Sequence, residues 1–201
     1  MEAPKRDLLI VSGFGSKKVD TLADTFQETE LFHDIQVMKG CPVWHARTNP
    51  HRLITGIGKR LDSFDRPVTL IGHSYGALLA LAAACRREIS EIEGLFINGP
   101  LNPEVEVNPP TGQSYDGYFR LFSAHYGLRR TIAQECVDVL SKATPEQKKG
   151  LITISSVEDR IVPPGAQELP GILEMRRFPA EIQGHSLNPE KIAFIKKILG
   201  A

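Results

Sequence analysis

The sequence has no excess of charge of either sign. Its 24 Lys and Arg residues equal its 24 Asp and Glu residues, so the formal net charge is zero. Because nucleic acids and anionic membranes are bound largely through basic surfaces, this balance argues against both as partners. A charged ligand would have to be recognised by a local group of side chains.

Cysteine is scarce, and long apolar runs are absent. Cys41, Cys85 and Cys136 form no C-x-x-C pair, so a disulfide framework and a zinc ribbon are both unexpected and the thiols should be reduced. The first apolar run, residues 8–11, is shorter than the ~7 to 15 residues of a signal-peptide core. No stretch approaches the ~18 apolar residues of a membrane span. We therefore expect a cytoplasmic protein that does not bind a membrane.

Short apolar runs that end in glycine, asparagine or serine recur along the chain, with helical spacing between them. Such runs are typical of strands that are buried on both faces of a parallel sheet. Strand and helix in alternation predict an α/β fold with a doubly wound, mostly parallel, six-stranded sheet. The expected strands are residues 8–11, 35–38, 68–71, 94–97, 151–154 and 174–178, and the expected helices are residues 19–32, 49–64, 75–89, 128–143 and 189–199.

Residues 101–149 are too many for a simple connection between two strands. The interval begins with a turn-rich loop and continues with aromatic residues at the spacing of an amphipathic helix. We expect residues 1–201 to form a single domain with 101–149 as a small, cap-like helical insertion. Phe119 and Phe122 are its candidate substrate-binding residues, and burial in the core is the alternative role for both.

The sequence Gly72-His73-Ser74-Tyr75-Gly76 lies between a predicted strand and a predicted helix. This is the G-x-S-x-G pattern in the context that it requires. A sharp turn there exposes the serine hydroxyl and brings the strand and the helix so close that a Cβ two residues before or after the serine would clash, which glycine avoids. Ser74 is therefore a candidate nucleophile, and the alternative is an idle serine in a tight turn.

This motif in its setting resembles the α/β-hydrolase superfamily, and the resemblance covers essentially the whole chain. In that family the acid follows the strand two beyond the nucleophile strand, and a histidine follows the last strand. The resemblance implies Asp159, which opens a D-x-x-V-P sequence, as the acid, with neighbouring Glu158 as its rival. It implies His185, in a Gly-His pair, as the base that accepts the proton of Ser74.

The resemblance is to the compact branch of small serine hydrolases and esterases. Only six residues precede Asp7, so we expect the two additional strands of larger family members to be missing. The family topology implies the strand order 2-1-3-4-5-6, with the site at the carboxyl ends of the strands. It also implies an oxyanion hole formed by the backbone N–H groups of Tyr75 and Phe14, although Ser12 stands where histidine is usual.

Together these expectations describe a serine hydrolase without cofactor or metal that cleaves a small carboxylic ester or a thioester through an acyl-enzyme. The main alternative is a catalytically inert binding or interaction module on the same fold. A third reading takes residues 13–18 as a phosphate-binding loop. That segment lacks both the third glycine of the dinucleotide fingerprint and the G-K-[ST] of a P-loop. The sequence does not indicate an oligomeric state.

Overall fold

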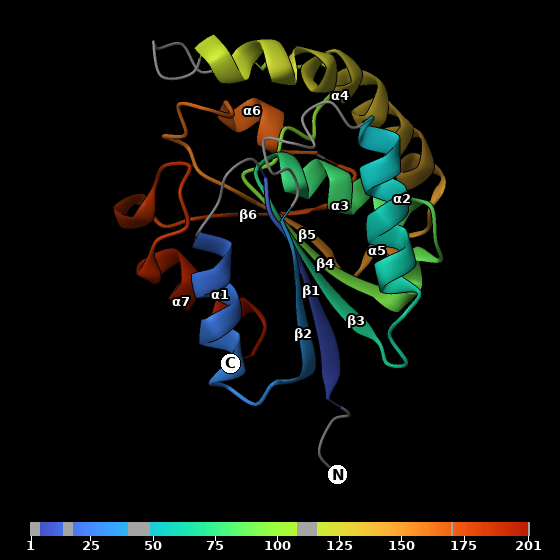
Figure 1. Ribbon diagram of the computed structural model, residues 1–201, viewed down its shortest axis with the longest axis vertical. Coiled ribbons are helices and arrows are strands. Elements are labelled where there is room, and N and C mark those ends of the chain that lie inside the picture. The colour runs from blue at the N-terminus through green and yellow to red at the C-terminus, as the bar shows by residue number, and fades with distance from the viewer. Residues whose placement is uncertain (1–4, 14–17, 40–48, 108–115, 170, 201) are drawn as a thin grey trace.

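The computed structural model describes residues 5–13, 18–39, 49–107, 116–169 and 171–200, with the backbone alone for residues 18 and 116–126 (Figure 1). Six strands form one sheet in the order β2-β1-β3-β4-β5-β6, and all five pairings are parallel. The predicted fold class and strand order are therefore confirmed. The strands are β1 (Arg6–Val11), β2 (Phe32–Met38), β3 (Val68–His73), β4 (Ile92–Ile97), β5 (Leu151–Ser155) and β6 (Glu174–Arg177).

Helices cover both faces of the sheet, as a doubly wound fold requires (Figure 1). On one face the buried apolar side chains of α2, α3 and α4 pack together with Leu9, Leu70 and Phe96 of the strands. On the other face α1 and α7 pack against a second set of strand residues, which includes Leu8 and Ile10. The helices are α1 (Lys18–Gln27), α2 (Pro50–Leu61), α3 (Tyr75–Cys85), α4 (Asp116–Lys142), α5 (Pro145–Lys148), α6 (Pro164–Gln167) and α7 (Pro189–Ile198).

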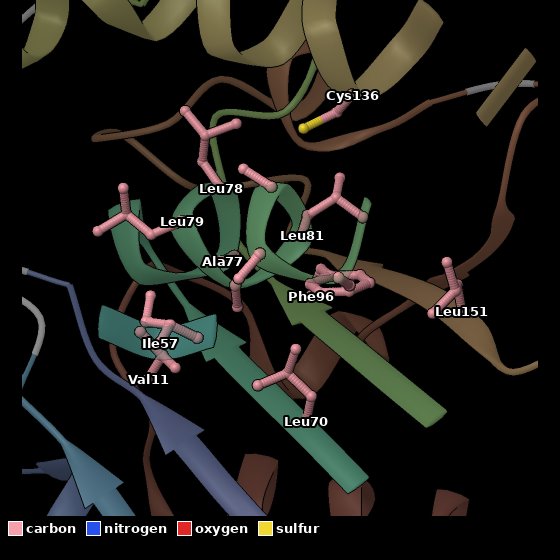
Figure 2. Packing of buried hydrophobic residues seen from close by; sticks show 14 of the residues in the cluster. Val11, Ile57, Leu70, Ala77, Leu78, Leu79, Leu81, Phe96, Cys136 and Leu151 are labelled. Carbon is pink, nitrogen blue, oxygen red and sulfur yellow. The ribbon is translucent and has the colours of Figure 1, made fainter. Parts of the chain in front are cut away.

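Helix α3, which follows the G-x-S-x-G motif, is the most deeply buried helix among those described. All of its residues except Cys85 are buried, and none of its residues is charged. Figure 2 shows it between the strand residues Leu70 and Phe96 on one side and Cys136 of α4 on the other. A helix that is apolar all round is stable only inside a core, where each fully buried leucine contributes ~1.5 to 3 kcal/mol. This packing holds the N-terminus of α3 firmly at the end of β3.

Four helices differ from the sequence prediction by more than one residue: α2 ends at Leu61 instead of residue 64, α3 ends at Cys85 instead of residue 89, and two others differ more. Helix α1 ends at Gln27 instead of residue 32, because Glu30 takes a left-handed turn (φ 52°) and Phe32 already opens β2. The aromatic segment and the helix expected at 128–143 form one helix, α4. Gly127 between them does not break it, since an isolated glycine costs a helix only ~1 kcal/mol relative to alanine.

Two of the three cysteines are described, and both are free thiols. They face each other across the contact of α3 with α4, and a hydrogen bond from Cys85 together with burial raises the pKa of Cys136. Cys136 is buried and Cys85 is half-buried, whereas Cys41 lies outside the described residues. None of the helices in the described ranges combines the length and the apolar character that crossing a membrane requires.

Candidate active site

Ser74 stands in the turn between β3 and α3 with a strained backbone, φ 58° and ψ −136°. A residue other than glycine rarely adopts such a conformation, which costs ~1 to 3 kcal/mol and persists only where the surroundings enforce it. Hydrogen bonds on both sides do so here: Ser74 N–H donates to the Ile97 carbonyl at 2.9 Å, and the Ser74 carbonyl accepts from Ala77 N–H at 2.9 Å. The turn therefore fixes where the hydroxyl points.

The glycines of the motif have the role that the sequence predicts. A Cβ on Gly72 would lie 2.5 Å from Ala77 Cα, and one on Gly76 would lie 2.5 Å from the Val11 carbonyl oxygen. Both distances are far below van der Waals contact, so the expected close approach of helix and strand is confirmed.

The structure brings the three predicted triad residues into one hydrogen-bonded chain. His185 Nε2 lies 2.9 Å from Ser74 Oγ, and His185 Nδ1 lies 2.7 Å from Asp159 Oδ2. Asp159 Oδ1 accepts two further bonds, from the N–H groups of Ile161 at 2.8 Å and Val162 at 3.0 Å. The residues lie in the turn or loops that follow three different strands, β3, β5 and β6, and are 26 to 111 positions apart in the sequence.

The surroundings of the Asp159 carboxyl favour its ionised form. Its side chain is fully buried, and burial alone would raise the pKa of the carboxyl. The hydrogen bond and the positive charge of His185, with the two backbone N–H donors, outweigh burial and hold the pKa below its ordinary value. Glu158, the rival acid, is exposed to solvent. The geometry therefore favours Asp159 as the partner of the histidine.

Two buried side chains hold the loop that carries His185. His73, within the motif, contacts the His185 carbonyl through Nε2 at 2.9 Å. Asn98, directly after β4, donates from Nδ2 to the carbonyls of Gly184 and His185, each at 3.1 Å. Burial, and then the charge of His185, lower the pKa of His73 to about 3, so that it is neutral and donates from Nε2. The backbone of the base is thus anchored from two neighbouring strands.

The loop that carries the acid is anchored by glutamines. Gln167 of α6 accepts from Ser156 N–H at 2.9 Å and donates to the Val162 carbonyl at 2.5 Å. Gln183 accepts from Val157 N–H at 2.6 Å. The sequence prediction missed these residues and Asn98. Asn98 carries the clearest signal, because a polar residue directly after a buried parallel strand lies at the edge where the site forms.

The predicted oxyanion hole lies partly within the described residues. Tyr75 is the first residue of α3, so its N–H belongs to the positive end of the helix dipole. Gly13 borders the same space, since a Cβ there would lie 3.0 Å from Ser74 Oγ. Ser12 is buried, and its hydroxyl donates to the Gly13 carbonyl at 3.2 Å. Phe14 lies outside the described residues.

The substrate-binding residues proposed from the sequence, Phe119 and Phe122, belong to the N-terminal half of α4, where the backbone alone is described. Their side chains therefore lie outside the described part of the chain, and their role stays a prediction. Within that part, no group of three or more His, Cys, Asp or Glu residues could hold a metal ion.

A hydroxyl, an imidazole and a buried carboxylate in one chain can perform a defined proton transfer. The imidazole nitrogen that faces Ser74 can take the hydroxyl proton while the carboxylate holds the opposite ring nitrogen in its protonated form. Such a pair converts a weakly acidic serine into a nucleophile. The arrangement is suited to acyl transfer.

Comparison with known proteins identifies relatives of this fold. No curated protein matches the chain. A solved structure of the metagenome-derived lipolytic enzymes LipS and LipT is similar with a TM-score of 0.66 and 17% identity, covering 98% of this chain and 92% of that one. Also similar in fold is Est1E from Butyrivibrio proteoclasticus, with a TM-score of 0.60 and 15% identity over 98% of this chain and 86% of that one. The esterase domain of a Rhodothermus marinus protein has a TM-score of 0.60 and 19% identity over 98% of this chain and 85% of that one. The model of the Alpha/beta hydrolase family matches residues 13–185, and the chain therefore belongs to that family.

Proposed function

We propose that this protein is a serine hydrolase that cleaves a carboxylic ester or a thioester of a small molecule. The observation that carries the proposal is the chain from Asp159 through His185 to Ser74, with distances of 2.7 and 2.9 Å. The strained conformation of Ser74 supports it, because strain at a hydroxyl in a site of this kind is a feature of activated nucleophiles. The similar esterases and lipolytic enzymes support the same reaction class.

The reaction follows from the positions of the three groups. Ser74 Oγ attacks the carbonyl carbon of the substrate while its proton moves to His185 Nε2. The tetrahedral intermediate then collapses, and the imidazolium returns that proton to the leaving alcohol or thiol. In the second half a water molecule attacks the carbonyl carbon of the acyl-enzyme while His185 Nε2 takes its proton. The bond from that carbon to Ser74 Oγ then breaks, the carboxylic acid product leaves, and the imidazolium returns the proton to Ser74 Oγ. Asp159 stays ionised and stabilises the imidazolium at Nδ1 throughout.

The negative charge on the carbonyl oxygen needs hydrogen-bond donors, each typically worth ~3 to 4 kcal/mol to the transition state. We assign this role to the N–H groups of Tyr75 and Phe14. The position of Tyr75 at the start of α3 supports the first, and the proximity of Gly13 to Ser74 supports the second.

We further propose that the chain is one domain in which residues 101–149 form a cap-like insertion that provides the substrate wall. Contacts of the described residues support this. Arg129 of α4 donates to the carbonyls of Asn102 and Val105, and Asn102 Nδ2 donates to the Gly165 carbonyl of α6. The insertion is thereby joined to α6, the helix that follows the loop carrying Asp159. Helix α4 also contains Phe119 and Phe122, the candidate residues of the substrate wall.

The free thiols of Cys85 and Cys136 support the cytoplasmic location that the sequence predicts. The two thiols are within hydrogen-bonding distance of each other but form no disulfide bond, as is usual in a reducing compartment.

The test is a hydrolysis panel of p-nitrophenyl esters and acyl-CoA thioesters of graded chain length. Wild-type protein should hydrolyse at least one series, and Ser74→Ala should lower kcat by ~10⁶-fold, as in other triad enzymes without their nucleophile. Ser186→Ala is the matched control and should retain activity. A folded wild-type protein that hydrolyses none of these esters would support the inert binding module instead.

A further inference from the structure

Lys191 is a fully buried lysine that the proposed mechanism does not use. It lies in the first turn of α7 on the same buried face as Ile195. Burying an ammonium group costs several kcal/mol, and the positive end of a helix dipole is an unfavourable place for a cation. A leucine or methionine there would suit the core better, so the contacts of the ammonium group must account for the lysine.

Those contacts reach two of the loops that form the site. Lys191 Nζ donates to the carbonyl of Gly184 and, at 2.9 Å, to the hydroxyl of Ser156. Gly184 directly precedes His185, and Ser156 lies in the loop that leads to Asp159. Nζ also lies 4.4 Å from the ring centroid of Phe178, a favourable cation–π distance. One buried side chain therefore joins the loop that carries His185, here called the base loop, to the loop that carries Asp159, here called the acid loop.

The loop that carries His185 has an unusual backbone conformation and is held by several hydrogen bonds. Gly184 has a φ of 93°, a conformation that other residues rarely adopt, and its carbonyl accepts from both Lys191 and Asn98. The next carbonyl, that of His185, accepts from Asn98 and His73. Three buried side chains from three different elements thus converge on two consecutive peptide groups. Lys191 differs from the other two because it also contacts the acid loop.

We propose that Lys191 is a positioning residue of the triad, whose ammonium group joins the Gly184 carbonyl to the Ser156 hydroxyl and so fixes His185 relative to Asp159. This inference rests on the proposed hydrolase function. Ser156 and Lys191 do not form a second nucleophilic pair, because both side chains are completely buried and no substrate could reach them.

The charged surroundings of Lys191 are consistent with this role. Burial lowers the pKa of Lys191 to about 8, although the Asp159 carboxylate opposes this effect, and the ammonium form predominates at pH 7. The other titratable groups nearby are His185, which follows Gly184, and His73, which the lysine charge helps to keep neutral. The carboxylate whose charge acts on Lys191 is the triad acid itself.

The experiment compares Lys191→Met with the wild type at pH 7, using kcat for a p-nitrophenyl ester divided by the number of sites that a fluorophosphonate can titrate. We expect kcat per titrated site to fall ~10- to 100-fold with KM within about twofold, because a misplaced catalytic group lowers the chemical step and not binding. The matched control is Lys197→Met, an exposed lysine of the same helix, which should behave as wild type.

Ser156→Ala removes only the acid-loop end of the link. It should lower kcat per titrated site ~3- to 10-fold, and the double variant should lose no more than Lys191→Met alone, since both changes break the same connection. If Lys191→Met does not fold, Ser156→Ala decides the question by the same measurement.

Wild-type kcat per titrated site in Lys191→Met, with a lower Tm, would show a purely structural lysine and overturn the inference. Unchanged kcat per site in Ser156→Ala would do the same where only that variant folds. Failure of the proposed hydrolase function is distinguishable from either result, because the wild-type protein itself would then neither react with the fluorophosphonate at Ser74 nor hydrolyse an ester.

Discussion

The two ends of the sheet carry different kinds of polar groups. At the carboxyl ends of the strands, Asp159, Asn98 and Lys191 are almost completely buried and hydrogen-bonded to the loops around Ser74. At the amino ends, a wide groove of about 980 Å³ is lined by charged side chains of both signs together with apolar residues such as Phe64. These charges pair with one another, as in Arg87 with Asp62 at 2.7 Å and Arg6 with Glu93 at 3.1 Å.

This difference indicates that the carboxyl end of the sheet, and not the amino end, is built for a reaction. Exposed ion pairs contribute little to stability and are common on any surface, so the volume of the groove does not by itself indicate a binding site. Buried polar groups are costly unless they have partners, and most of those in the described residues lie in or beside the loops around one strained serine, although Asp7 at the amino end of β1 is also buried. Changes at the carboxyl end should therefore alter the reaction, and changes at the amino end should leave it unaffected.

After loss of the nucleophile Ser74 itself, the largest expected effect is that of Asp159→Asn. The amide can no longer select the required tautomer of His185 or stabilise its charged form, so kcat should fall ~10³- to 10⁴-fold while the fold is retained. Steady-state kinetics with circular dichroism would measure both. The control is Glu158→Gln, which should change kcat little because Glu158 is exposed. The reverse pattern would mean that the acid has been misassigned.

The next effect concerns His73 and the stability at acid pH. Its folded-state pKa of about 3 lies below the ordinary histidine value of 6.5, so between these values the unfolded chain binds a proton that the native protein does not. Stability is then fully present above pH ~6.5 and declines on acidification by up to ~1.4 kcal/mol per pH unit.

Urea unfolding of wild type and His73→Gln between pH 6.5 and 4.5 would test this. The glutamine amide keeps a donor for the His185 carbonyl but does not titrate, so this variant should lose less stability on acidification. Equal slopes for the two proteins would show that His73 is not held neutral by the fold.

A smaller effect is expected from Phe119→Ala and Phe122→Ala, which test whether the insertion belongs to the functional end of the molecule. Removing a wall of the acyl pocket should change the preference between ester chain lengths, since one methylene in such a pocket is worth ~1 to 3 kcal/mol. Profiles of kcat/KM against chain length would show this. An equal loss for every ester together with a lower Tm would place both rings in the core instead.

The smallest effect is expected at the amino end, from Asp62→Asn. The hydrogen bond from Arg87 lowers the pKa of Asp62, but the pair is exposed and screened by solvent. We expect kcat/KM to stay within about twofold of wild type and Tm to change by no more than ~2 °C. A large loss of activity would contradict the comparison and direct attention to the groove.

The sequence predicted the sheet well, because strands buried on both faces have continuous apolar runs that are visible without an alignment. It also singled out Ser74, Asp159 and His185, which the structure brings into one hydrogen-bonded chain. Local motifs made this possible, since each residue stands in a recognisable setting after a strand.

The supporting residues could not be predicted in the same way. From the sequence alone, Lys191 is an ordinary polar residue of the last helix, and Gln167 belongs to a loop. Their roles depend on contacts with residues far along the chain, such as the 35 positions between Lys191 and Ser156. The merging of two expected helices into α4 was missed for a related reason, because a single glycine inside a helical pattern does not decide whether the helix continues.

The central claim is that Ser74 is an activated nucleophile, and reaction with a fluorophosphonate tests it most directly. A serine that is hydrogen-bonded to a histidine base attacks phosphorus at neutral pH, whereas an ordinary serine does not. We predict a single adduct, mapped to Ser74 by mass spectrometry, that forms more slowly in acid because a protonated imidazole cannot accept the serine proton. Ser74→Ala should abolish labelling and His185→Ala should nearly do so. An adduct on another serine, or no adduct on protein shown to be folded, would contradict the account.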